Sequence, residues 1–187
     1  LDHGFIALGG GKASCLANLS VQQDVQSQYS LTAVQHGWSL SRLEPRIIQL
    51  DGKGQTEIKC LQISTEEQQL ATHSLVNFQG PDGSLNQLQK SIACHKSHSI
   101  FNGIIQVPQI AQKTNASQLS RNLLLSHRAR IDAKPELEII ADNVRCAHGA
   151  TVSRLQEDEL FYLRSRGISS NQAIYLLLKG YCQEITD

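Results

Sequence analysis

The sequence has no methionine, few aromatic residues and no net charge. Because methionine is absent, Leu1 is not a translation start, and we expect a segment of the natural protein to precede it. Lysine plus arginine number 17, as do aspartate plus glutamate, so the chain lacks the charge excess that favours nucleic-acid or anionic-membrane partners. No apolar run approaches the roughly 20 residues of a membrane-spanning helix, and no signal peptide is recognisable. We expect a soluble protein with neither a nucleic-acid nor a membrane partner.

The cysteines are few and widely spaced, with no CxxC pair. The five are Cys15, Cys60, Cys94, Cys146 and Cys182. A small secreted protein held by disulfides has dense, even-numbered cysteines, so that class is excluded. We interpret most of the five as small buried apolar residues and expect a reducing, cytoplasmic compartment, either a bacterial cytosol or a plastid stroma.

Glutamine, by contrast, is abundant, with 20 residues. Many long polar side chains together with few aromatics suit a sheet-rich protein with a narrow, aliphatic interior. We expect polar residues, glutamine included, to cover its outside.

Turn signals divide the first 152 residues into short segments. Residues 51–54 (Asp-Gly-Lys-Gly) and 80–83 (Gly-Pro-Asp-Gly) are typical of turns. An alternating apolar and polar stretch, 56–63, follows the first of them and predicts a strand. No long helical period is present before residue 153.

A faint internal repeat indicates a solenoid. His-Ser-Leu-Val-Asn at 73–77 resembles His-Ser-Ile-Phe-Asn at 98–102, a spacing of 25 residues. Short strands at such a spacing are typical of a β-helix, in which parallel strands stack rung on rung. The repeat predicts that His73 and His98 lie on adjacent rungs, where we favour a structural role for both.

The clearest strand signal is the stretch 128–139. Its even positions are charged, and its odd positions are apolar or proline, an alternation that puts the charges on one face of a strand. Pro135 cannot donate to a sheet ladder, so it predicts an edge or a break. We interpret the charges as a solvated outer face and not as a catalytic cluster.

Helical signals begin after residue 152. Ser153 and Gln156 fit a capping box, and acidic residues follow in the first turn. Gly167 is well placed to end this helix, and Ser169 with Gln172 opens a second one. The second helix has an apolar face that needs a partner surface, formed by Ala173, Leu176, Leu177 and Tyr181.

Cys146 and His148 form the sharpest constellation. In a strand, residues two apart point to the same face, roughly 6.5 Å apart, so a thiolate and an imidazole could reach one iron or zinc ion. Two ligands do not make a closed site, and the others would have to come from elsewhere. Core packing is the common alternative for such a triplet. A Cys–His nucleophile is disfavoured because no orienting third residue is recognisable.

The chain has no phosphate-binding loop of the GxxxxGK[ST] type. If ATP is used, a partner must use it.

At this point the sequence resembles the SufB/SufD family of the Suf iron–sulfur cluster assembly machinery. The matching segments are 101–103 (Phe-Asn-Gly), 112–114 (Gln-Lys-Thr), 121–126 (Arg-Asn-Leu-Leu-Leu-Ser), 137–142 (Leu-Glu-Ile to Asp), 146–152 (Cys-Ala-His-Gly-Ala-Thr-Val) and 158–168 (Asp-Glu-Leu-Phe-Tyr-Leu-Arg-Ser-Arg-Gly-Ile). The likeness is dense from about residue 99 to 181, and the Cys-x-His-Gly-Ala-Thr form is similar to the D-type (SufD) subunit.

The resemblance implies a mainly β fold, a right-handed parallel β-helix over residues 1–152 followed by a short C-terminal helical segment, 153–187. It implies a scaffold subunit without catalysis of its own, in a complex with a SufB-like subunit and a SufC-like ATPase of the ABC type. A transient iron–sulfur cluster would form between the B-type and D-type chains. His148 matches the histidine implicated in assembly, and Cys146 matches its neighbouring cysteine.

The resemblance also implies that the first helical segment docks the ATPase subunit. The residues expected to bind this partner are Asp158, Glu159, Phe161, Tyr162, Arg164, Arg166 and Gly167. Aromatic residues beside arginines are typical of interface hot spots. Packing of Phe161 and Tyr162 onto the last rung is the alternative. The family's N-terminal helical region is absent from the sequence.

Two other functions stay open at this point. A β-helix polysaccharide lyase or hydrolase would carry clustered carboxylates or basic residues in a groove, whereas the charges of 128–139 alternate along one strand face. A purely structural solenoid would have no chemistry at all. Whether the chain also associates with itself is left undecided.

Overall fold

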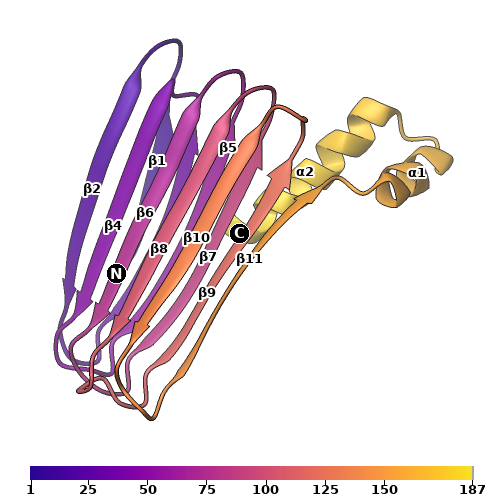
Figure 1. Cartoon of the computed structure of the whole chain (residues 1–187). Helices are drawn as coiled ribbons and strands as arrows, with labels where there is room; N and C mark the ends of the chain where they lie inside the picture. Colours follow the sequence, from indigo (N-terminus) through magenta and orange to yellow (C-terminus); the bar gives the residue numbers. More distant parts are fainter. Residues whose placement is uncertain (187) are drawn as a thin grey trace.

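In the computed structural model, which describes residues 1–186, the chain forms eleven β-strands followed by two α-helices (Figure 1). The strands are β1 (Asp2–Leu8), β2 (Ser14–Gln23), β3 (Gln28–His36), β4 (Leu40–Gln49), β5 (Gln55–Ser64), β6 (Gln69–Phe78), β7 (Ser84–Ala93), β8 (His98–Val107), β9 (Asn115–Leu124), β10 (Arg130–Ile139) and β11 (Arg145–Arg154). The helices are α1 (Glu157–Ser165) and α2 (Ser170–Thr186).

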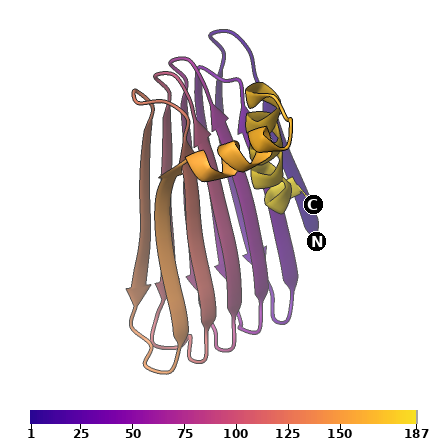
Figure 2. The same ribbon diagram turned by 90° about the vertical axis from the view of Figure 1, so that its right-hand side faces the viewer.

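The strands stack as two facing parallel sheets. One sheet has the order β1-β3-β5-β7-β9-β11 and the other β10-β8-β6-β4-β2. Every neighbouring pair is parallel, and the chain alternates between the sheets to make a solenoid of about five turns. Figure 2 shows the helices lying against one side of this stack. The predicted β-helix followed by C-terminal helices is confirmed.

The spacing of the internal repeat was wrong. β6 pairs with β8 so that Gln69 lies opposite His98 and His73 lies opposite Asn102, which sets the rung at 29 residues and not 25. A rung must hold two strands of ten residues and two turns, so its length is fixed by the path around the solenoid. The two similar segments therefore lie out of register, and His73 and His98 do not stack.

The predicted turns are confirmed, and they stack on each other. Residues 50–54 join β4 to β5, and residues 79–83 join β6 to β7. Gly52 has φ +87°, and a Cβ there would lie 2.3 Å from the carbonyl oxygen of Pro81 in the next turn. Only glycine allows both this left-handed backbone and this close approach.

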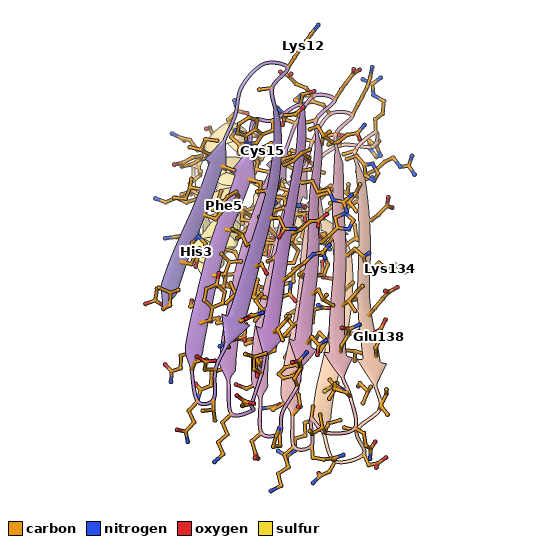
Figure 3. All side chains as sticks on the ribbon, turned by 90° about the vertical axis from the view of Figure 1, so that its left-hand side faces the viewer. His3, Phe5, Lys12, Cys15, Lys134 and Glu138 are labelled. Atoms are coloured by element: carbon orange, nitrogen blue, oxygen red, sulfur yellow. The ribbon has the colours of Figure 1, made fainter. Side chains whose placement is uncertain are left out.

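The charged strand is also confirmed, as β10 at the edge of its sheet. Its charged side chains face outward, and Figure 3 shows Lys134 and Glu138 projecting from the solenoid. Pro135 lies opposite Gly103 of β8 and has no strand on its other side. The missing N–H therefore removes no bond from a second ladder.

The expectation that glutamines cover the outside was wrong for a large group of them. Fully buried glutamines alternate with aliphatic residues along the inward faces of the strands: Gln23, Gln35, Gln49, Gln62, Gln87, Gln89 and Gln118. A parallel solenoid places these side chains one strand spacing apart, so an amide can bond to an amide or hydroxyl of a neighbouring rung. The interior is half polar and still largely hydrogen-bonded, in keeping with the cost of burying an unpaired polar group.

The remaining interior is apolar. Its largest fully buried side chains are Phe78, Phe101, Leu31, Leu43, Ile47, Ile58, Leu70 and Ile105. The burial of about 1.5–3 kcal/mol per such side chain is the main drive for stacking the rungs.

The predicted capping box at Ser153 and Gln156 was wrong. Ser153 belongs to β11, where it pairs with Leu123 of β9, and α1 begins at Glu157 without a side-chain hydrogen bond from its N-cap residue, Gln156. Strand pairing continues to Arg154 and takes this segment before a cap can form. The end of α1 is as predicted, because Gly167 follows it in a left-handed conformation with φ +83°.

The cap of α2 is confirmed, but its buried face is not the predicted one. The Ser169 hydroxyl accepts from the backbone N–H of Gln172, and the Gln172 side chain in turn contacts Ser169. Ala173 and Ile185 are the buried residues of α2, whereas Leu176 is exposed. No helix among residues 1–186 is long and apolar enough to cross a membrane.

The buried amide network yields a stability prediction. The Thr72 hydroxyl accepts hydrogen bonds from the Nε2 atoms of Gln35 and Gln62, both at 2.9 Å. Thr72→Val keeps the volume but leaves both amides without an acceptor, so we expect a loss of about 2–4 kcal/mol in the free energy of unfolding by urea titration. Thr72→Ser keeps the hydroxyl, and its lost methyl group costs about 1 kcal/mol. A valine variant as stable as the serine variant would contradict the prediction.

Candidate functional site

Cys146 and His148 lie on β11, at the edge of the six-stranded sheet. Cys146 is opposite Ala116 and His148 is opposite Gln118 on β9. Both β9 residues are buried inside the solenoid, so the strand predicted around Cys146 directs its two candidate ligands toward the interior side.

No further rung covers that side within residues 1–186. After β11 the chain leaves the solenoid and forms α1 and α2, so the inward faces of β10 and β11 form an open end. The open end is lined by Ile131, Ala133, Leu137, Ile139, Cys146, His148, Ala150 and Val152. These residues hold positions that are buried one rung earlier, yet Ile139 is 40% and Val152 48% exposed.

The environments of the two candidate ligands differ. Cys146 is partly buried and packs against the core, and this burial raises the pKa of its thiol, while a hydrogen bond with the Ala116 backbone lowers that pKa to a smaller extent. His148 is exposed at the open end. A metal that binds Cys146 must therefore displace a proton from the thiol.

The described residues contain no group of three or more His, Cys, Asp or Glu side chains that could hold a metal ion. Cys146 and His148 therefore provide at most two ligands from this part of the chain. Such a pair can contribute to a site that another molecule completes.

The candidate partner-binding residues all lie on the surface of α1 or just after it. Phe161 is 72% and Tyr162 57% exposed, so neither packs onto the last rung. The Arg166 guanidinium lies 5.2 Å from the centre of the Tyr162 ring, a cation–π contact. A shallow apolar groove runs beside them, lined by Asp158, Glu159, Tyr162, Leu163 and Leu177.

A buried lysine fixes α2 to the solenoid. Lys90 of β7 is 3% exposed, forms an ion pair with Glu184, and donates to the carbonyl oxygen of Tyr181 at 2.7 Å. The Tyr181 hydroxyl donates to the carbonyl oxygen of Arg121 at 2.6 Å, and the Arg121 side chain also contacts Glu184. Lys90 and Arg121 together lower the pKa of Glu184, with the Lys90 hydrogen bond as the largest cause.

The sequence gave no signal for this group of residues. Lys90 lies on the outward face of β7, where a lysine is ordinarily solvated. Only the packing of α2 across the sheet covers it, and the partner residues come from a segment far along the chain.

Comparison with known proteins places the chain among iron–sulfur cluster assembly factors. Residues 1–181 match the family model described as SUF system FeS cluster assembly, SufBD core domain. The chain is 45% identical over 177 residues to an iron–sulfur cluster assembly SufBD family protein of Synechocystis, covering 95% of this chain and 39% of that protein.

Two further relatives come from a plant and a bacterium. The chain is 40% identical to the chloroplastic protein ABCI7 of Arabidopsis thaliana, over all of this chain and 40% of that protein. It is 37% identical to the iron–sulfur cluster assembly protein SufD of Escherichia coli, over 74% of this chain and 33% of that protein. The chain thus spans two fifths or less of these relatives.

The burial of Cys146 yields a prediction on thiol reactivity. Because its pKa is raised above the ordinary value of 9.0, the thiolate is scarce near neutral pH, and we expect alkylation by iodoacetamide to keep accelerating above pH 9.0. Burial raises the pKa of Cys60 to about 12, so this thiol stays unmodified in the folded protein. Peptide mass spectrometry measures both rates, with the urea-unfolded chain as reference. A Cys146 rate that levels off below pH 9 would show that the prediction is wrong.

Proposed function

The chain belongs to the SufBD core family of iron–sulfur cluster assembly proteins, and from this we propose that it acts as a D-type scaffold subunit without catalysis of its own. In this proposal its open end pairs with a B-type subunit, and the cluster is cargo that is built between the two chains. A C-type ATPase of the ABC class hydrolyses ATP and docks on the C-terminal helices. The chain itself binds no nucleotide.

The open end is the observation that carries the proposal. Both sheets stop there, at β10 and β11, and each leaves the backbone groups of its outer edge without a strand partner among residues 1–186. Unpaired edges are templates for a strand of another chain. The half-exposed apolar residues between the two edges, such as Leu137 and Val152, would be covered at the same time. These features favour a partner that continues the solenoid.

The position of His148 supports a shared cluster site. His148 and Cys146 lie at this end, so a partner that covers it would bring its own ligands within reach. Imidazole and thiolate are suitable ligands for iron. Two ligands from one chain leave the other positions to sulfide and to the B-type subunit. A cluster held across an interface can be released when the interface opens, as a cargo requires.

The same end could also receive a second copy of this chain. A two-fold axis would place the same edge strands against each other. The family resemblance favours the B-type subunit, and the two arrangements differ in whether one chain alone assembles a cluster.

The surface of α1 supports the docking of the ATPase subunit. Exposed aromatic residues beside arginine are enriched in binding hot spots, and Phe161, Tyr162 and Arg166 have this character. The Lys90–Glu184 pair fixes α2 to β7, and α1 packs on α2. A movement of the ATPase could therefore act on the solenoid through these helices.

The central test is anaerobic reconstitution with iron and sulfide. We expect visible absorbance near roughly 400 nm from an iron–sulfur cluster only when the chain is mixed with a B-type subunit, and we expect its loss in His148→Ala. His127→Ala is the matched control, because His127 is also exposed but lies in the turn before β10. Circular dichroism verifies that both variants fold. A full cluster yield in His148→Ala would refute the shared site, and a cluster on the chain alone would favour self-association.

The docking surface has its own test. Phe161→Ala removes an exposed ring, so we expect little change in stability but a loss of about 30-fold in affinity for the C-type ATPase, as for a hot spot of about 2 kcal/mol. Isothermal titration calorimetry measures it. Ile110→Ala is the control, since Ile110 is 65% exposed in the turn at the opposite end of the strands. Equal affinities for the two variants would show that α1 is not the docking surface.

A further inference from the structure

Gln118 lies directly beneath His148 in the solenoid. The two residues are register partners on the parallel strands β9 and β11, one strand spacing of about 4.8 Å apart, and both face the interior side. Gln118 is 1% exposed, whereas His148 is exposed at the open end. The imidazole therefore sits on a buried amide.

A chain of hydrogen bonds fixes the orientation of this amide. Gln87 donates through Nε2 to the Ser74 hydroxyl at 2.8 Å. Its Oε1 is thereby left to accept from Nε2 of Gln118, also at 2.8 Å. Gln118 consequently presents Oε1 on its other side, and this oxygen is buried without a hydrogen-bond partner.

The packing around Gln118 confines the amide further. Gly103 on the facing sheet leaves room for it, because a Cβ at that position would lie 2.4 Å from Nε2 and 2.9 Å from Cδ of Gln118. An unsatisfied buried acceptor is costly, typically about 1–3 kcal/mol, and such atoms call for an explanation. The amide is thus held in place with one acceptor unused beside His148.

We propose that Gln118 is a positioning residue for His148, whose ring donates one N–H to Oε1 of Gln118. This hydrogen bond fixes one tautomer, so the other ring nitrogen keeps its lone pair toward the open end and toward the iron of the cargo. Metal-binding histidines commonly donate their second N–H to a carbonyl or carboxylate, which orients the ring. The inference rests on the proposed function, since it assigns an orienting partner to the ligand proposed there.

Nitrogen-15 NMR of the histidine-labelled chain tests the hydrogen bond without any cluster. At about pH 8, where an ordinary imidazole is neutral, the ring shifts report the tautomer. We expect a single tautomer for His148 and a mixture for the exposed His127. In Gln118→Leu, His148 should shift to the mixture. Gln62→Leu is the matched control, because it removes another fully buried amide on β5, away from β11, and should leave the His148 signals unchanged.

The expected effect on assembly is smaller than that of removing the ligand. We expect the iron concentration for half-maximal reconstitution with the B-type subunit to rise at least 10-fold in Gln118→Leu, as when an orienting partner of a metal-bound histidine is lost. Gln62→Leu should not change it.

The outcomes separate this inference from the proposed function. If wild-type His148 shows the same tautomer mixture as His127, the inference is overturned, and this result needs no variant to fold. Unchanged His148 signals in Gln118→Leu overturn it as well, even if His148→Ala still abolishes the cluster. A single tautomer that depends on Gln118, with a cluster yield that is indifferent to His148, would instead refute the proposed function.

Discussion

The stacking of one rung on the next is the interaction on which the structure depends. Each strand satisfies its backbone groups with the strands of the preceding and following rungs, and each inward face is covered by the same neighbours. This requirement holds along the whole solenoid until β10 and β11, where the chain turns away into two helices. The open end is therefore the place where the construction principle of the fold is left incomplete, and Cys146 and His148 lie there.

Stacking also explains which parts of the fold could be predicted from the sequence. The turn at 51–54 and the alternating strand around Pro135 are local patterns, and the structure confirms them. The rung length and the interior glutamines are not local. A residue such as Gln62 reads as an outward polar position until its partner Thr72, on the other sheet, is known. Ser153 was assigned to a helix cap because its pairing with β9 leaves no trace in the nearby sequence.

The candidate site shows the same division. The spacing of Cys146 and His148 predicts that they share a strand face, and the exposed positions of Phe161 and Tyr162 follow the helix predicted around them. The openness of the solenoid end could not be predicted, because it depends on which strand is last. The Lys90–Glu184 pair and the amide of Gln118 were missed for a related reason. Their roles arise from contacts between segments that are distant in the chain.

The account stands on the claim that a partner subunit completes the open end. Amide hydrogen exchange of the chain, with and without the B-type subunit, tests this claim most directly, because backbone N–H groups at an unpaired edge exchange readily until a strand pairs with them. The account predicts new protection in β10 and β11 on adding the partner, with no change in β4 and β6 at the centre of the other sheet. Protection confined to the outer face of the five-stranded sheet, with β10 and β11 exchanging as before, would contradict it.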